Sequence, residues 1–242
     1  MSVAGVDHQY TVFRRAGGGL AIALAGVELV LRPSGALWIE AKGALVVADL
    51  HLEKGSFFAA RGQMLPPYDT RETLFRLAAE VDALAPRVVV LLGDSFHDGD
   101  GHSRLGAADV ASLEALAAGR TLIWVAGNHD AHGLAGAPGE TVERLALGSL
   151  ALAHEPAETP VKGEIAGHLH PCAKVTAAFG AVRRRCFVTD GERMILPAFG
   201  AFAGGLNVRD AAFAALFTRR PLAAALGAAW VHAVGWRNLR GD

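Results

Sequence analysis

Apolar runs that end in polar residues recur through the first half of the chain. Small, β-branched and other apolar side chains make up most of residues 44–50 (ALVVADL), 87–94 (RVVVLLGD) and 121–130 (TLIWVAGNHD). Runs of this length and composition are typical of strands that are buried on both faces. We therefore predict three strands of one covered sheet.

Two longer segments lie between these strands and have a different pattern. Residues 69–84 and 107–119 carry apolar side chains at helical spacing, so both are predicted to be helices. Asp69 or Thr70 is expected to cap the first of them, since short polar side chains accept from free N–H groups at a helix start. Strands that alternate with helices indicate helices packed on the outer face of the sheet.

The rest of the chain is predicted to be mostly strand. Before residue 44, the expected strands are residues 19–31 and 36–40, joined by the turn RPSG. After residue 141, they are residues 145–155, 164–170, 173–179, 181–189 and 193–199. The dipeptide Asp190-Gly191 favours a hairpin turn between the last two. The predicted fold class is α/β (α+β), a four-layer αββα sandwich of two mixed β-sheets flanked by helices.

Composition narrows the functional classes only a little. Hydrophobic residues make up 52% of the chain, which is enough apolar material for a folded core. The net charge is only −1, so any contact with DNA must depend on a local basic patch. The two cysteines cannot form a disulfide framework, which favours a reducing, cytoplasmic location. Residues 14–31 begin like a twin-arginine leader, but Glu28 interrupts the apolar run and a strand pair is expected. No apolar run has the length of a membrane span, so no membrane partner is expected.

Polar residues of metal-binding types follow five of the predicted strands. The stretches are DLH (49–51), GDSFHD (93–98), GNHD (127–130), HEP (154–156) and GHLHP (167–171). Ligands of sheet proteins gather beyond the carboxyl ends of strands, so these side chains are expected to converge. The donors are carboxylates, an amide and imidazoles without a thiolate, a set that suits Mn²⁺, Fe or Zn²⁺. They are too many for one tetrahedral ion, and two ions would clamp the oxygens of a phosphoryl group.

The order of these five stretches resembles that of the calcineurin-like binuclear metallophosphoesterases. That resemblance implies one ion held by Asp49, His51, Asp94 and His170, and a second held by Asp94, Asn128, His154 and His168. It also implies that His129 acts as general acid near the leaving oxygen, that Asp130 orients His129, and that Asn128 helps to neutralise charge. The chain departs from the family pattern at His97, where Asp or Asn is usual, so the role of this position is open.

A narrower resemblance covers most of residues 20–210. The stretches ADLHLEKGSFFAARGQMLPPYDT, LLGDSFHD, IAGHLHP, RRRCF and LPAFGAFAGGLNV are similar to those of the ligase-associated DNA damage response metallophosphoesterases. This resemblance implies a manganese-dependent DNA endonuclease or phosphodiesterase that favours single-stranded DNA and acts in repair beside a DNA ligase and a helicase. The whole chain, residues 1–242, would be a single metallophosphoesterase domain, with the metal motifs in 45–171 and a strand-rich part in 172–242. Its oligomeric state is left open.

Several basic and aromatic residues are candidates for substrate contacts. The candidates for phosphate or substrate binding are His97, Lys54, Arg61, Arg104, Arg183 and Arg185. Arg183 and Arg185 would share one face of a strand, and a solvated edge strand is the alternative for both. The aromatic side chains that could stack on bases are Phe57, Phe58, Tyr68 and Phe96, although at least two of them are expected in the core.

Two other functions remain open at this stage. A phosphodiesterase or phosphatase acting on a nucleotide or another small phosphoester would use the same metal chemistry, and only substrate profiling separates it from a nuclease. A non-catalytic scaffold of the same fold would be expected to have lost ligands, whereas every ligand position is filled in this chain.

Overall fold

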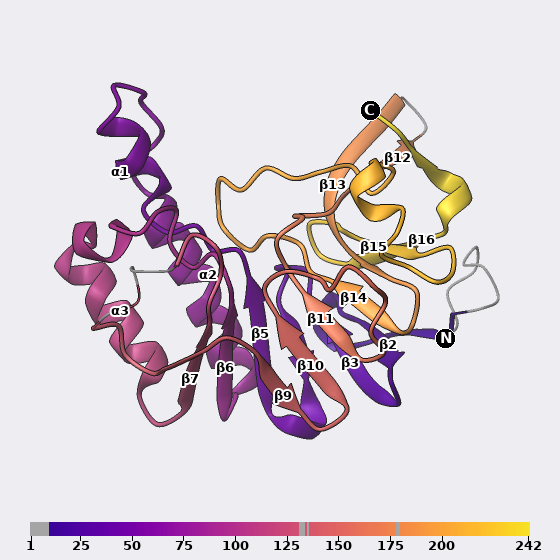
Figure 1. Cartoon of the computed structure of the whole chain (residues 1–242), viewed down its shortest axis with the longest axis horizontal. Helices are drawn as coiled ribbons and strands as arrows, with labels where there is room; N and C mark the ends of the chain where they lie inside the picture. The colour runs from indigo at the N-terminus through magenta and orange to yellow at the C-terminus, as the bar shows by residue number, and fades with distance from the viewer. Residues whose placement is uncertain (1–9, 131–133, 135, 178–179) are drawn as a thin grey trace.

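A computed structural model describes residues 10–130, 134, 136–177 and 180–242, which form two mixed β-sheets (Figure 1). In the first sheet, the described strands follow one another in chain order: β1 (Val12–Arg14), β2 (Leu20–Leu24), β3 (Val27–Leu31), β4 (Leu37–Ile39), β5 (Ala44–Ala48), β6 (Val88–Leu92), β7 (Thr121–Val125) and β8 (Glu140–Val142). Strands β1 to β5 pair antiparallel, whereas β5 to β8 pair parallel.

The second sheet is built from the later part of the chain. Across the sheet, its described strands are β16 (Val231–Val234), β15 (Leu222–Leu226), β13 (Gly180–Thr189), β14 (Arg193–Ile195), β11 (Glu164–Ala166), β10 (Leu150–Ala153) and β9 (Leu145–Leu147). Beside them, β12 (Cys172–Ala177) pairs with β13 and with β17 (Leu239–Arg240). Strands β10, β11 and β14 run parallel, so this sheet is mixed as well.

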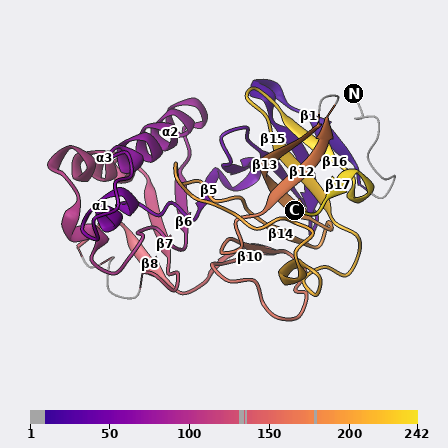
Figure 2. The same cartoon turned by 90° about the horizontal axis from the view of Figure 1, so that it is seen from above.

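The alternation of side chains along β5 shows how the layers form. Val46 and Ala48 point into the core shared by the two sheets, where they join Leu152 and Phe187 of the second sheet. Leu45 and Val47 point the other way, into a second core. That core is closed by α2 (Asp69–Leu84) and α3 (Ala107–Ala117), which lie along the outer side of β5 to β7 (Figure 2). The continuously apolar strands are therefore buried on both faces, as predicted.

The outer face of the second sheet is covered differently. Phe213, in the 3₁₀ turn η4 (Ala211–Phe213), packs with Leu216 against Ala166 and Ile195. In the part of the chain that the structure describes, the α-helices thus belong to the side of the first sheet, and turns and loops close the other side. The segment before Leu222 contains charged residues and a proline in short succession, which favours turns over a long helix.

Most predicted elements are present with shorter bounds. Helix α2 covers residues 69–84 as predicted, and the apolar stretch after Arg14 forms the β2–β3 pair. The predicted strand 44–50 stops at Ala48, because Asp49 leaves the sheet. The hairpin β15–β16 and the short helix α1 (Lys54–Ala59) were not predicted. Among the described residues, no helix is both long enough and apolar enough to cross a membrane.

Candidate metal centre

The carboxyl ends of five parallel strands meet between the two sheets. Strands β5, β6 and β7 of the first sheet are followed by Asp49, Asp94 and Asn128, and strands β10 and β11 of the second by His154 and His168. The two aspartates and the two histidines of this set, together with His51 and His170, form two adjoining groups, and the donor atoms of each group lie within 4.8 Å of one another. The convergence that the strand pattern predicted is thus present in the fold.

The first group consists of Asp49, His51 and His170. Nε2 of His51 lies 3.2 Å from Nε2 of His170, and Nε2 of His170 lies 3.4 Å from Oδ1 of Asp49. The carboxylate of Asp49 is fully buried and also accepts hydrogen bonds from the backbone N–H of His168. Residues from both sheets therefore share this group.

The second group consists of Asp94, His154 and His168, with Asn128 beside it. Nε2 of His154 lies 3.4 Å from Oδ1 of Asp94, 3.2 Å from Nδ1 of His168 and 2.8 Å from Oδ1 of Asn128. The other nitrogen of His154, Nδ1, lies 3.6 Å from Oδ1 of Asp49. His154 thus stands between the carboxylates of the two groups.

Five of these residues have a left-handed backbone. The φ angles are 54° at Asp49, 45° at His51, 44° at Asp94, 69° at His168 and 46° at His170. A positive φ is uncommon in residues other than glycine and costs conformational energy. Its concentration at the two donor groups indicates that the backbone is bent to aim these side chains, which is a common property of functional sites.

Close packing and backbone hydrogen bonds join the motifs to one another. A side chain at Gly93 would overlap the ring of His154, with its Cβ only 2.1 Å from Nδ1, and a Cβ at Gly167 would lie 2.6 Å from the carboxylate of Asp49. The backbone N–H of His51 donates to the carbonyl of Asp94 at 2.9 Å. Glycines that precede the metal-type residues therefore make room for donors from other strands, as expected.

The electrostatics of the site act differently on its two buried imidazoles. Burial would lower the pKa of His154, but the hydrogen bond with Asp94 and the charges of Asp49 and Asp94 raise it. Burial, together with the neighbouring His170, lowers the pKa of His51 to about 3, so its ring is neutral near pH 7. Burial alone would raise the pKa of Asp94, but the hydrogen bond and charge of His154 and the N–H of His129 overcome it and lower this pKa to about 2. Deprotonated carboxylates and neutral imidazoles are the forms that bind metals.

The two groups fit a pair of metal ions. Nδ1 of His51 and Nδ1 of His154 are buried without a hydrogen-bond partner, and imidazole nitrogens face one another at 3.2 Å in each group. In each group a nitrogen of one imidazole thus lies close to a nitrogen of another and to a carboxylate oxygen, an arrangement that a cation between them would satisfy. The nitrogen and oxygen donors are common to Mn²⁺, Fe and Zn²⁺ sites, and the geometry does not select one of these metals.

The two residues predicted for proton transfer have different surroundings. The side chain of His129 is 48% exposed, with Nε2 at 3.9 Å from Oδ2 of Asp94, and its backbone N–H donates to Oδ1 of Asp94. Asp130 is buried, and its carboxylate accepts from the backbone N–H groups of Ser95, Phe96 and Gly127. Asp130 was predicted to orient the ring of His129. Its carboxylate instead connects the loops that follow β6 and β7 by these hydrogen bonds.

Of the predicted substrate residues near α1, Lys54 and His97 lie beside the metal groups, whereas Arg104 has a structural contact. Lys54 donates to the carbonyl of Phe202 at 3.1 Å, and its charge lowers the pKa values of His51 and His97, so its ammonium lies on the side of the metal groups. His97 lies against His51, with the ring centroids 5.7 Å apart. Arg104 instead spans from Ser56 to Asp98 and braces the base of α1.

The predicted basic strand face is largely engaged with a loop. Arg183 donates to the carbonyl of Gly205 at 2.6 Å, and Arg185 donates to the carbonyl of Ala198 at 2.8 Å. The two side chains share a face, as predicted, and both hold the loop of residues 198–205. Arg76 of α2 also donates to this loop, at the carbonyl of Phe199.

The loop of residues 198–205 was not predicted to belong to the site. The N–H of Gly200 donates to the carbonyl of Asp49, and a Cβ at Gly205 would lie 2.1 Å from the carbonyl oxygen of His170. The loop therefore packs directly behind the first donor group. Its glycines and small residues were the available signal, but nothing in their spacing shows which part of the chain they contact.

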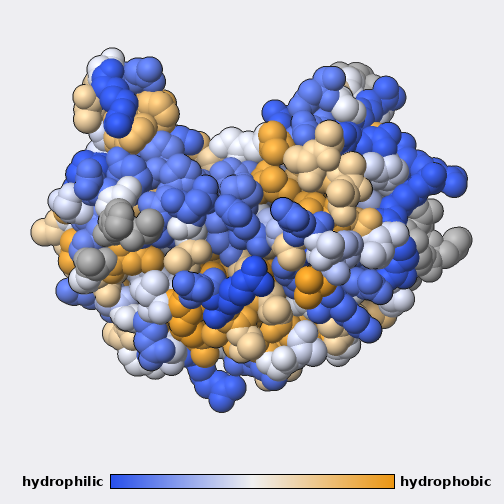
Figure 3. Space-filling model, viewed as in Figure 1, coloured by the Kyte–Doolittle hydropathy of each residue, from blue (hydrophilic) through white to orange (hydrophobic). Residues whose placement is uncertain are grey.

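Two projections stand on either side of a hollow in the surface. Figure 3 shows them at the upper edge of the molecule, where Figure 1 places α1 on one side and the β12–β13 hairpin on the other. Both projections start next to metal-type residues: α1 begins three residues after His51, and β12 begins two residues after His170. The hollow therefore lies between two segments that both start close to the donor groups in the chain.

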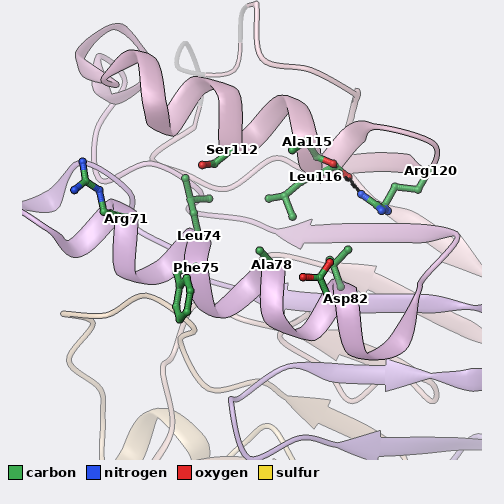
Figure 4. A pocket seen from close by; sticks show the side chains of 10 residues that line it. Arg71, Leu74, Phe75, Ala78, Asp82, Ser112, Ala115, Leu116 and Arg120 are labelled. Carbon is green, nitrogen blue, oxygen red and sulfur yellow. Dashed lines mark hydrogen bonds between the residues drawn. The ribbon is translucent and has the colours of Figure 1, made fainter.

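A separate cavity of about 310 Å³ lies between α2 and α3 (Figure 4). Its lining includes Leu74, Ala78 and Leu116, with Arg71 and Arg120 at its rim. None of the residues that line it belongs to the two donor groups. This cavity therefore has no part in the candidate site.

Comparisons with known proteins agree with this geometry. Residues 44–183 match the family described as calcineurin-like phosphoesterase. The chain is similar to the crystal structure of the nuclease MPE of Pseudomonas putida, with 28% identity and a TM-score of 0.68 over 88% of this chain and 100% of that one. It also matches the E. coli phosphoesterase YfcE at 14% identity and a TM-score of 0.41, over 79% of this chain and 98% of that one. No curated protein matches it.

Proposed function

Because the chain belongs to the calcineurin-like phosphoesterase family, we propose that it is a DNA endonuclease or phosphodiesterase that acts on single-stranded DNA. The chain is a metal-dependent phosphoesterase, and the proposal concerns its substrate. The observation that carries it is the pair of donor groups beside the starts of the two projections, which leave a hollow between them that would accept a phosphodiester within a longer chain. The similar structure from Pseudomonas putida is that of a nuclease, which supports this choice.

Some residues of the site would bind the metal ions, and another would transfer a proton. One ion would be held by Asp49, His51 and His170, and the other by Asp94, Asn128, His154 and His168. The carboxylate of Asp94 is also close enough to His51 to act on its charge, so it would contribute to binding both ions. When bound, the ions would lower the pKa of water and neutralise charge on the phosphate. His129 has an exposed ring that can hold a proton at Nε2 for the leaving oxygen.

The biological setting is part of the same proposal. The stretches that resemble the ligase-associated metallophosphoesterases support action in DNA repair beside a DNA ligase and a helicase. They also favour Mn²⁺ among the metals that the donor set accepts.

Covalently closed single-stranded DNA circles provide the decisive test. Protein loaded with Mn²⁺ is incubated with single-stranded circles, duplex circles and a small phosphodiester, and the products are resolved by electrophoresis. The proposal requires linearisation of the single-stranded circles, since only an endonuclease cuts a strand without ends. Turnover of the small diester with both circles intact would remove the DNA assignment and keep the phosphoesterase chemistry.

A further inference from the structure

A short arm (residues 54–68) leaves the metal centre directly after His51 and carries half-exposed aromatic side chains. It consists of α1 and the loop that follows, and it forms one of the two projections in Figures 1 and 3. Phe57 and Phe58 are only partly buried, Tyr68 is 58% exposed and Met64 is 87% exposed. Exposed apolar side chains that are gathered on one segment, as they are here, are a feature of binding surfaces.

The rings of the arm continue into the metal centre. The guanidinium of Arg61 lies 3.5 Å above the ring of Phe57, whose centroid is 4.6 Å from that of His97. The ring of Phe58 lies 5.5 Å from that of His97 at a tilt of 31°. The ring of His97 is nearly parallel to that of His129, at 8° and 6.3 Å. We call Phe57, Phe58 and His97 the aromatic platform.

Polar contacts fix the base of the arm without covering these rings. Thr70 of α2 donates to the carboxylate of Glu53, and the N–H of Gly55 donates to the carboxylate of Asp69. From the other side, Arg104 donates to the hydroxyl of Ser56. The aromatic side chains are therefore not needed to anchor the arm. The guanidinium of Arg61 covers one face of the Phe57 ring, and the exposed parts of the rings remain available to a ligand.

The charges beside the aromatic platform suit a ligand that is both flat and anionic. Lys54 and Arg61 contribute positive charge, whereas the nearby carboxylates of Glu53, Asp69 and Asp98 are engaged by hydrogen bonds within the protein. A nucleotide combines a flat base with a phosphate, and bases stack on aromatic rings and on guanidinium groups.

We propose that the aromatic platform stacks on the base of the nucleotide whose phosphate lies at the metal centre. This inference rests on the proposed function and specifies its substrate as a phosphodiester with an unpaired base next to the scissile bond. A base within a duplex has both faces covered by its neighbours, so the platform selects single-stranded DNA. Such stacking tolerates all four bases, because each has a π face.

Three diesters with the same leaving group test this proposal on the metal-loaded protein. They are the p-nitrophenyl phosphodiesters of thymidine at its 5′ oxygen, of the corresponding abasic deoxyribose, and of methanol. The double variant Phe57→Leu/Phe58→Leu keeps apolar volume but removes both π faces. Phe75→Leu, which changes an exposed phenylalanine on α2, is the matched control.

The expected result is a preference, measured as kcat/KM, for the thymidine ester over the abasic ester of at least about fivefold, which corresponds to one stacked base. In the double variant the ratio of kcat/KM for the thymidine ester to that for the abasic ester falls to about one, whereas Phe75→Leu keeps the ratio of the unaltered protein. Equal rates with the thymidine and abasic esters in the unaltered protein would overturn the proposal. So would an equal fall with all three esters in the double variant, which would indicate a packing role.

The outcome is independent of the test with DNA circles. If the protein prefers the thymidine ester but leaves the circles intact, the stacking proposal is supported and the endonuclease proposal is refuted. The protein would then be a phosphodiesterase for small nucleotides. Cut circles without a base preference would keep the endonuclease and reject the platform.

Discussion

The metal centre and the arm are neighbours in the chain but are built on opposite principles. Asp49, Asp94 and His154 are at most 4% exposed and are held by hydrogen bonds between motifs from both sheets. The arm begins a few residues later, is fixed only at its base, and leaves Tyr68 and Met64 open to solvent. Chemistry that depends on fixed distances thus occupies the rigid strand ends, and recognition of the rest of the substrate is left to an exposed segment.

The largest effect is expected from damage to the metal centre. Asp94→Ala removes the carboxylate that lies beside both His154 and His129, so hydrolysis of a small phosphodiester should fall by at least about 10³-fold. Bound metal, measured by elemental analysis, should fall as well. Asp82→Ala on the exposed side of α2 is the control and should keep both metal and activity. Full activity of the Asp94 variant would refute the role of this group.

A smaller effect separates proton transfer from metal binding. His129→Ala should retain the metal content of the unaltered protein, because the ring of His129 belongs to neither donor group, and should lower kcat by ~10²–10⁴. The comparison with Asp94→Ala is decisive. If both variants lost metal to the same degree, His129 would be a structural or ligand residue instead of an acid.

The smallest effect is expected at the arm. Arg61→Ala removes an exposed cation that rests on Phe57, so single-stranded DNA should bind a few-fold more weakly, and the slope of log K against log salt should fall by about one. Hydrolysis of the methyl p-nitrophenyl diester should be unaffected, since that substrate does not reach the arm. An unchanged salt dependence would show that Arg61 makes no phosphate contact.

Much of the metal centre could be predicted because its signals are local. Asp49, Asp94 and His168 each follow an apolar strand, and in parallel strands such ends lie at one edge of a sheet. Helix α2 was predictable for the same kind of reason, since its apolar spacing is read within a few turns. At least two of the four aromatic candidates for base stacking were expected in the core, but of the four only Phe96 is buried, where it stacks on Trp124.

Contacts between distant segments could not be predicted in the same way. Asp69 or Thr70 was expected to cap its own helix, but Asp69 binds Gly55 and Thr70 binds Glu53, so both residues hold the arm. Asp130 holds the loop after a different strand, and Arg185 holds a loop instead of facing solvent. In each case the residue type was compatible with several partners, and only the packing selected one.

The sequence by itself determined which residues could bind metal and that they would follow buried strands, because hydrophobic periodicity and strand ends are properties of neighbouring residues. The tertiary structure decided how those residues group into two sites, which loop lies behind them, and where the arm stands. Those outcomes depend on the pairing and packing of segments that are distant in the chain. Asp49 and His168, for example, are 119 positions apart and are joined by a hydrogen bond. No local pattern records a contact of that kind.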